Sequence, residues 1–224
     1  MTSNSRKQLE NWIKNISIPD GSLVLDVGGS QNPVKNRLNN VGANCEFRVL
    51  DLEEPHECKQ KPDIICDLNN VNFIHTGSCE GAYCWEEPEA KIIYTKDKPK
   101  CYKEFNVDFD VVFCLEVSEY WFSPINALKN INYFLKKKGD LFISFHFLYP
   151  IHKPSGLDYL RYTEYGAIKL LEETGFRVEE IKYREMSASG EGAYLTYNAV
   201  EGNREDKDYK KHFNSGYLIK AVKI

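Results

Sequence analysis

Short apolar runs alternate with helix-like segments along the chain, and this alternation constrains the fold more than any other feature of the sequence. Most of these runs are apolar at consecutive positions rather than at every second one. Strands of that kind are typical of a parallel sheet that is covered on both faces. The expected strands span residues 22–27, 45–50, 63–66, 109–114 and 140–145. We therefore predict an α/β fold built around a mostly parallel sheet.

Helical segments flank these strands. Apolar residues recur at helical spacing over residues 9–16, which predicts an opening amphipathic helix. Between the fourth and fifth strands, Ser123 and Pro124 have the residue types of an N-cap and a first helical residue. The apolar residues that follow predict a helix running as far as Gly139. These two strands and their helix are therefore expected to form a βαβ unit.

The last third of the chain predicts one more helix and two more strands. Thr163 is expected to cap the helix and Gly175 to end it. Residues 176–183 and 216–223 are the expected sixth and seventh strands. The segment between them has several turn-forming glycines and no helical period. We therefore expect these two strands to be antiparallel neighbours at the edge of the sheet.

A long insertion separates the third and fourth strands. Residues 72–106 take the place of a crossover that needs only about a dozen residues. Their glycines and prolines argue against one long helix, whereas residues 83–85 and 91–95 could pair as a small β-excursion. Two interpretations stay open, a lid over a binding site and a surface decoration without a role. We expect residues 1–224 to form one domain that carries this insertion.

Charge and composition exclude several classes of protein. The formal net charge of −4 provides no general attraction to nucleic acid, which disfavours such a partner. No apolar stretch approaches the roughly 20 residues that a transmembrane helix needs, so no membrane span is expected. The first ten residues lack the apolar core of a secretory signal, and the seven cysteines show no disulfide-framework spacing. These features predict a cytoplasmic protein.

Acidic residues follow each of the first three strands. Ligands of open α/β sheets bind beyond the carboxyl ends of the strands, so these positions are candidate contacts. Asp26 precedes a pair of glycines in the turn after the first strand, Asp51 follows the second strand, and Asp67 follows the third. Residues 28–33 read GGSQNP and lack the glycine fingerprint that cradles a pyrophosphate. The pattern therefore indicates a ligand without phosphates.

The chemistry of these side chains fits a nucleoside that carries a positive charge. The carboxylate of Asp51 can accept hydrogen bonds from both hydroxyls of a ribose. Asp67 can accept from an exocyclic amine of adenine, and Leu52 and Leu68 offer apolar surface to the faces of its ring. A carboxylate at Asp26 suits a cationic group, since it would repel an anion. The expected ligand is a nucleoside plus a cation.

The same segments resemble a known family. Residues 23–29, 49–53, 63–69 and 109–119 are similar to the successive motifs of class I S-adenosylmethionine-dependent methyltransferases. Residues 109–119, 135–139, 158–163 and 175–176 resemble those of its small-molecule type 11 group. The resemblance implies a Rossmann-like three-layer sandwich, whose seven-stranded, mostly parallel sheet has an antiparallel last strand. It also implies S-adenosylmethionine as the cofactor and methyl transfer as the activity.

The resemblance assigns cofactor contacts to the strand ends. It implies an amino-acid-binding loop at Asp26, Gly28 and Gly29, a ribose contact at Asp51, adenine contacts at Asp67 and Leu68, and a wall at Leu115 and Glu116. Ser30 and Leu52 complete the expected cofactor contacts. Two positions depart from the family pattern. Ser30 stands where the loop usually has a further glycine, and Tyr120 replaces a histidine that often follows the fourth strand.

The residues after the fifth strand are the candidate acceptor site. His152 is the expected general base, because imidazole titrates in the range that suits a hydroxyl acceptor. Together with Tyr149, Asp158 and Arg161, it resembles a Y-P-x-H…D-Y-x-R-Y-T stretch of methyltransferases associated with glycan biosynthesis. The residues expected to contact the acceptor are His146, Tyr149, Tyr120 and Arg161. Two alternatives stay open: His152 only hydrogen-bonds the following loop, and His146 only packs between its neighbouring phenylalanines.

These features lead to one leading hypothesis and two alternatives. The leading hypothesis is methyl transfer from S-adenosylmethionine to a hydroxyl or amine of a small-molecule or glycan-linked acceptor. The alternatives are a non-catalytic nucleoside-binding module and a nucleic-acid methyltransferase. The histidines and cysteines in and near the insertion include the pair Cys79 and Cys84, but they form no CxxC pair, so no metal is expected.

Overall fold

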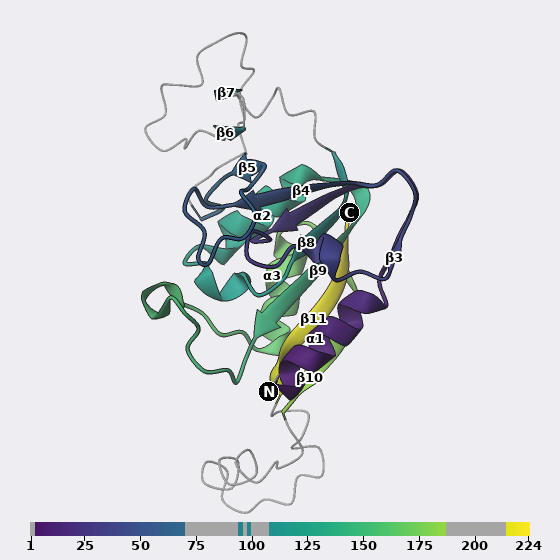
Figure 1. Ribbon diagram of the computed structural model, residues 1–224. Coiled ribbons are helices and arrows are strands. Elements are labelled where there is room, and N and C mark those ends of the chain that lie inside the picture. Colours follow the sequence, from purple (N-terminus) through teal and green to yellow (C-terminus); the bar gives the residue numbers. More distant parts are fainter. Residues whose placement is uncertain (1–2, 70–93, 96–97, 100–107, 187–213) are drawn as a thin grey trace, which may run out of the picture.

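The fold is built on one twisted sheet whose central strands run parallel (Figure 1). The computed structural model describes residues 3–69, 94–95, 98–99, 108–186 and 214–224. The parallel strands are β2 (Leu23–Val27), β4 (Glu46–Asp51), β5 (Ile64–Ile65), β8 (Phe109–Cys114) and β9 (Leu135–His146). Their spatial order is β5-β4-β2-β8-β9, so the direction of winding reverses between β2 and β8. Ligands of such sheets bind at this reversal point.

The two C-terminal strands complete the sheet as the sequence predicts. β10 (Phe176–Glu185) lies at the edge, and β11 (Asn214–Lys223) runs between β10 and β9, antiparallel to both. Within the described residues, this gives the expected seven strands with an antiparallel last strand. The pairing places Gly216 opposite His146 at the carboxyl end of β9.

Two short strands extend the sheet beyond β5. β6 (Tyr94–Thr95) pairs with β5 and with β7 (Lys98–Pro99), in both cases antiparallel. Residues 83–85, which were expected to pair with residues 91–95, lie outside the described residues. Most of the insertion at 72–106 also lies outside them, so its two interpretations stay open. A separate small sheet of β1 (Ser17–Ile18) and β3 (Asn40–Val41) was not expected.

The sheet is covered on both faces. Helix α1 (Asn4–Lys14) crosses the face in front of β10 and β11 (Figure 1), and its buried Leu9, Trp12 and Ile13 pack on Phe142 and other apolar residues. Helices α2 (Pro124–Phe134) and α3 (Glu164–Glu173) cover the opposite face. The short 3-10 turns are η1 (Val34–Asn36), η3 (Ser118–Tyr120) and η4 (Ser155–Leu157). The result is a three-layer sandwich with a core on each side of the sheet.

The predicted helix ends are right at α3 and wrong at α2. Thr163 caps α3, because its Oγ1 accepts a hydrogen bond from the Gly166 N–H at 3.2 Å. The prediction carried α2 to Gly139, but the helix ends at Phe134 and β9 begins at Leu135. Leu135 is fully buried and pairs with Phe109 of β8, so tertiary packing overrides the helical pattern there. Along the described parts of the chain, no helix is both long and apolar enough to cross a membrane.

Candidate functional site

A cavity of about 870 Å³ lies at the carboxyl ends of the parallel strands. The predicted site residues that line it are Gly28, Asp51, Leu52, Asp67, Leu68, Glu116, Tyr120, Tyr149 and His152. Residues that sequence reasoning did not single out also line it, including Arg6, Gln31, Asn69 and Val117. The cavity therefore joins the loops after β2, β4 and β5 to those after β8 and β9, and its size suits a small-molecule ligand.

Asp51 holds together two of the loops that form the nucleoside side of the cavity. Its Oδ2 accepts a hydrogen bond from the Ser30 N–H at 3.1 Å, and its Oδ1 accepts from the Leu52 N–H at 2.8 Å. A carboxylate has about four acceptor positions, so two backbone bonds leave capacity for ligand hydroxyls. The Asp67 carboxylate similarly accepts from the Asn69 N–H at 3.0 Å. Both carboxylates are thus fixed in place by backbone groups.

Gly28 lies against Val117, which follows β8. Its φ of +72° is in the left-handed region, and its N–H donates to the Leu50 carbonyl at 2.7 Å. A Cβ at this position would lie 2.4 Å from Cγ2 of Val117. Because both the backbone conformation and the space exclude a side chain, only glycine fits here.

Asp26, the predicted contact for a cationic ligand, does not line the cavity. It is 5% exposed, and its Oδ2 accepts a hydrogen bond from the Val34 N–H at 2.6 Å. Burial raises the pKa of its carboxyl group to about 7, despite the opposing effect of the Val34 hydrogen bond. Asp26 therefore holds the chain after β2 through the Val34 N–H.

Three further predicted cofactor contacts also lie outside the cavity lining: Gly29, Ser30 and Leu115. A Cβ on Gly29 would lie 2.3 Å from Oδ2 of Asp26, so this glycine accommodates the buried carboxylate. Ser30 is fully buried. Leu115 packs in the core beneath α1, on the other side of the sheet from α2. Glu116, the next residue, lines the cavity.

The burial of Asp26 predicts a pH-dependent stability. A carboxyl group with a raised folded-state pKa stabilises the protein at low pH, and this contribution is lost as the pH rises from about 4 to about 7. The Asp26→Asn variant keeps an oxygen for the Val34 N–H and carries no charge. We expect its free energy of unfolding to match the native chain at pH 4 and to exceed it by about 2–4 kcal/mol at pH 8.

Urea denaturation at the two pH values measures this difference. Asp20→Asn is the matched control, because Asp20 also accepts a backbone hydrogen bond, from the Ala43 N–H at 2.9 Å, but is exposed. If the free energies of unfolding of Asp26→Asn and the native chain differed by the same amount at both pH values, the raised pKa of Asp26 would be contradicted.

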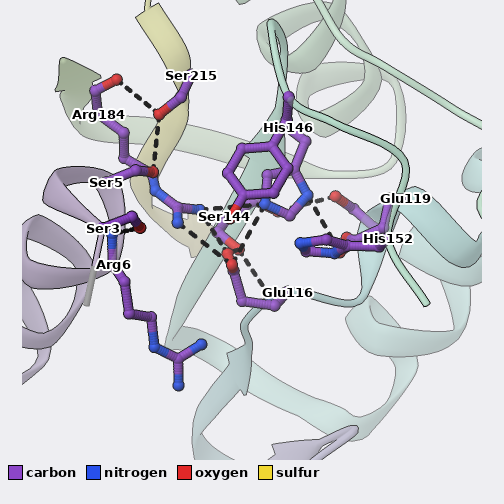
Figure 2. Close-up of polar contacts among 12 residues, drawn as sticks. Ser3, Ser5, Arg6, Glu116, Glu119, Ser144, His146, His152, Arg184 and Ser215 are labelled. Atoms are coloured by element: carbon purple, nitrogen blue, oxygen red, sulfur yellow. Dashed lines mark hydrogen bonds and ion pairs between the residues drawn. The ribbon is translucent and has the colours of Figure 1, made fainter. Parts of the chain in front are cut away.

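A chain of charged side chains lies beside the cavity, at the carboxyl ends of β8 and β9 (Figure 2). Arg184 of β10 is fully buried, and its two Nη atoms contact the Glu116 carboxylate at 2.5 and 3.3 Å. Glu116 also lies 3.3 Å from Nε2 of His146. On the other side of His146, Nδ1 lies 3.1 Å from Oε1 of Glu119, and the same oxygen lies 2.7 Å from Nδ1 of His152. The chain thus runs Arg184–Glu116–His146–Glu119–His152.

The backbone at Glu116 is held in a conformation that residues other than glycine rarely adopt. Its φ is +60°. Ser144 stabilises this turn, since its Oγ accepts from the Glu116 N–H at 2.7 Å and donates to Oε1 of Glu116 at 3.0 Å. Strained residues of this kind are concentrated at functional sites.

The ionisation of this chain follows from its neighbours. Burial opposes the charged forms of both carboxyl groups, but His146 and Arg184 hold the pKa of Glu116 well below its usual value. Contacts with His146 and His152 likewise lower the pKa of Glu119. Burial alone would lower the pKa of His146, but Glu116 and Glu119 raise it to about 9. At neutral pH, His146 is therefore an imidazolium ion between two carboxylates.

His152 is the member of this chain that combines a histidine ring with access to the cavity. Its side chain is 25% exposed, while that of Glu119 is fully buried. Because Glu119 accepts the hydrogen of Nδ1, the neutral ring has its lone pair on Nε2. The rings of His146 and Tyr149 lie 4.7 Å away and restrict its orientation. This arrangement suits a general base.

Three side chains at this site have groups that could ligate a metal, but the neighbouring arginine does not suit a bound cation. Glu116, His146 and His152 bring one potential ligand atom each to within 4.8 Å of one another. The guanidinium of Arg184 already supplies a positive charge there, at 2.5 Å from Glu116 and 3.3 Å from Nε2 of His146. A divalent cation would have to displace it.

Two residues predicted to contact the acceptor do not line the cavity, and both have partners within the protein. His146 is 1% exposed and does not line the cavity, so it acts within the buried chain. Arg161 forms an ion pair with Asp158 and donates to the carbonyls of Tyr149 and Pro150. Asp158 in turn accepts from the backbone N–H of His152 at 2.6 Å. Arg161 therefore fastens the loop that carries His152, and it does not contact the cavity.

The site also contains residues that the sequence analysis missed. Glu119 and Arg184 have the residue types of surface positions, and nothing in their spacing marks them as buried. Arg6 reaches the cavity from α1, which precedes the first strand of the main sheet and is far from the strand-end motifs in sequence. Asn69 could have been found, since it lies two residues after Asp67 in the same strand-end segment. Its Oδ1 accepts from the Phe122 N–H at 3.0 Å and joins the loops after β5 and β8.

Comparison with known proteins identifies the fold. No protein-family model matches the chain, and no curated protein matches its sequence. Among solved structures, an S-adenosylmethionine-dependent methyltransferase from Mesorhizobium loti is 12% identical, aligns over 98% of both chains and has a TM-score of 0.55. The chain therefore has the Rossmann-like fold of these methyltransferases.

Two other solved structures show that proteins with this fold have different activities. The 1,6-didemethyltoxoflavin-N1-methyltransferase of Burkholderia thailandensis, with bound S-adenosylhomocysteine, is 12% identical over 98% of this chain and 76% of its own, with a TM-score of 0.50. The [4+2]-cyclase SpnF is 12% identical over 96% of this chain and 80% of its own, with a TM-score of 0.53. Because proteins of this fold include a cyclase, the fold alone does not fix the reaction.

Proposed function

We propose that this chain is an S-adenosylmethionine-dependent methyltransferase that methylates a hydroxyl group of a small-molecule or glycan-linked acceptor. One observation carries the proposal: Asp51, suited to a ribose, and His152, suited to a general base, line the same cavity. Asp51 follows β4 and His152 follows β9, on opposite sides of the reversal point between β2 and β8. The cavity can therefore receive a nucleoside and an acceptor side by side.

The cavity residues fit the proposed cofactor. On the side of β4 and β5, the carboxylates of Asp51 and Asp67 offer acceptors to the ribose and to the adenine amine, and Leu52 and Leu68 offer apolar surface to the ring. Gly28 and Val117, which lie against each other, form the part of the lining between the two groups of loops. The sulfonium group of the cofactor supplies an activated methyl group.

The geometry of His152 favours a hydroxyl acceptor over an amine. Methyl transfer joins the methyl carbon to the acceptor oxygen and breaks its bond to sulfur, which leaves the reaction as a neutral thioether. The acceptor proton passes to Nε2 of His152, and the Glu119 carboxylate stabilises the imidazolium that forms. An amine that reacts in its neutral form needs no base during the transfer. The oriented histidine is therefore best explained by an acceptor that must lose a proton.

Tyr120 and Tyr149 are the proposed acceptor contacts. Both line the cavity, and their rings lie 6.4 Å and 4.7 Å from the ring of His152. The Tyr120 hydroxyl donates to the Lys153 carbonyl at 2.8 Å, which holds the two loops together. Aromatic faces beside a base suit a flat or sugar-like acceptor.

Arg6 is the proposed partner of the cofactor carboxylate. It lines the cavity, and its Nε is held by Glu10 at 2.9 Å, which leaves its terminal nitrogens for an anion. We expect Arg6→Gln to weaken binding of S-adenosylhomocysteine about 10-fold or more, since a charge-assisted hydrogen bond is lost. Binding of 5′-methylthioadenosine, which lacks the amino-acid moiety, should not change.

Calorimetric titration with both ligands measures this selectivity. Lys7→Gln is the control, because Lys7 is an exposed neighbour on the same helix. If Arg6→Gln weakened the binding of both ligands equally, Arg6 would contact the nucleoside instead.

Transfer of a labelled methyl group to a panel of hydroxyl and amine acceptors tests the proposed activity. Turnover of any acceptor excludes a non-catalytic binding module, and turnover confined to amines would overturn the choice of a hydroxyl. Salt-dependent binding and methylation of RNA or DNA would favour a nucleic-acid methyltransferase instead.

A further inference from the structure

We propose that Arg184 is a positioning residue that keeps His152 neutral. Its guanidinium supplies a positive charge to the buried carboxylates, and without it a second proton would be needed on the pair of histidines His146 and His152. This inference rests on the proposed role of His152 as a base, and it adds a residue that acts on that base from the edge strand β10. Arg184 does not line the cavity and does not contact His152. It acts through the chain of charges between them.

The contacts place Arg184 at one end of this chain and His152 at the other. Arg184 is fully buried and bonded to Glu116, and its guanidinium also lies over the ring of Tyr149 at 5.8 Å. Ser215 fixes its backbone, since the Ser215 Oγ donates to the Arg184 carbonyl at 2.9 Å (Figure 2). The arginine therefore has one defined position.

Charge balance within this chain determines where protons reside. The two carboxylates, Glu116 and Glu119, carry two negative charges in a buried environment. The guanidinium of Arg184 neutralises one of them and a proton on His146 neutralises the other, in accord with the raised pKa of His146. The chain is then neutral without a proton on His152. His152 can therefore accept a proton at neutral pH.

Other charged groups near His152 do not change this balance. Asp158, which accepts from the backbone N–H of His152, is paired with Arg161 of the same loop. The nearby phenol of Tyr120 is uncharged at neutral pH, because burial and the carboxylates of Glu119 and Asp158 raise its pKa above the usual value. Lys153 follows His152 directly and is exposed to solvent, which screens its charge.

Replacing Arg184 by glutamine removes one positive charge and keeps a polar side chain. The two buried carboxylates then retain one uncompensated charge, which favours a second proton on the histidine pair. His146 already carries one proton, so His152 takes the second, and the titration of His152 distinguishes this outcome from protonation of Glu116. We expect the pKa of His152 to rise by about one unit or more. The conservative Arg184→Lys variant keeps the charge, so its effect should be below about a third of a unit.

Nuclear magnetic resonance titration of the His152 imidazole tests the inference on the full chain without cofactor. Arg177→Gln is the matched control, because Arg177 lies on the same strand but is exposed and pairs with Glu179. If Arg184→Gln misfolds, the Arg184→Gln/Glu116→Gln double variant removes both members of the ion pair and should return the pKa of His152 to its native value. An unchanged pKa of His152 in Arg184→Gln, or an equal rise in Arg177→Gln, would overturn the inference.

The pH profile of activity provides the second readout. In Arg184→Gln the acid limb of kcat/KM should move up in pH with His152, so that activity falls about 10-fold at pH 6 and is retained at pH 8.5. A purely structural role would lower activity equally at both pH values. The titration needs neither cofactor nor acceptor, so its result can be interpreted even if the chain does not transfer methyl groups. Conversely, an active enzyme with an unmoved profile overturns only the role of Arg184.

Discussion

Replacing His152 by alanine is expected to lower kcat for methyl transfer to a hydroxyl acceptor by roughly 10²- to 10⁴-fold, the usual contribution of a positioned general base. Affinity for S-adenosylhomocysteine should change little, because Asp51, Asp67 and Gly28 lie on the other side of the cavity. A loss in kcat with an unchanged cofactor affinity indicates an interaction that matters in the transition state. Steady-state kinetics and a binding titration on the same preparation measure both quantities.

A second histidine of the cavity provides the control. His56 also lines it, with a side chain 46% exposed, but it belongs to the loop after β4 and not to the buried chain of charges. We expect His56→Ala to leave kcat unchanged. If the His152→Ala variant retained native kcat, methyl transfer would depend on positioning alone and His152 would not be the base.

Replacing Gly28 by alanine is expected to lower the free energy of unfolding by about 2–4 kcal/mol and to abolish measurable cofactor binding. Two costs add: an alanine at a φ of +72° is strained, and its Cβ would lie 2.4 Å from Cγ2 of Val117. Either Val117 or the glycine loop must move, and both line the cavity. Thermal denaturation and calorimetry with S-adenosylhomocysteine check the two effects.

Gly21→Ala separates these two costs. Gly21 has a similar φ of +70°, but a Cβ there would meet no atom within 4 Å. Its alanine variant should lose only the strain contribution of about 1–2 kcal/mol and should bind the cofactor normally. Equal stability losses in the two variants would show that Val117 gives way without cost, contrary to the role assigned to Gly28.

The sheet could be predicted because its strands are short and apolar at consecutive positions. The fourth expected strand matches β8, Phe109–Cys114, residue for residue. The error at the end of α2 has a physical reason. Leu135 fits the apolar period of the helix equally well, and only its pairing with Phe109 assigns it to β9. A periodic pattern identifies an element more reliably than it identifies its ends.

The site was predicted in part. Acidic residues after three strands directed attention to the carboxyl ends of the sheet, where the cavity lies. The sequence does not distinguish a carboxylate that lines the cavity, as Asp51 does, from one that is buried in its own loop, as Asp26 is. Glu119 and Arg184 could not be predicted, because a buried ion pair between distant segments leaves no local pattern. Arg184 in particular lies on an edge strand among exposed charged residues.

Titration of the full chain with S-adenosylhomocysteine shows whether the cavity binds the methyl donor. We expect one binding site per chain with a dissociation constant below about 1 mM, and at least about 10-fold weaker binding to Asp51→Ala. No binding at that concentration, or binding that is indifferent to Asp51, would contradict the proposal that this cavity holds the methyl donor.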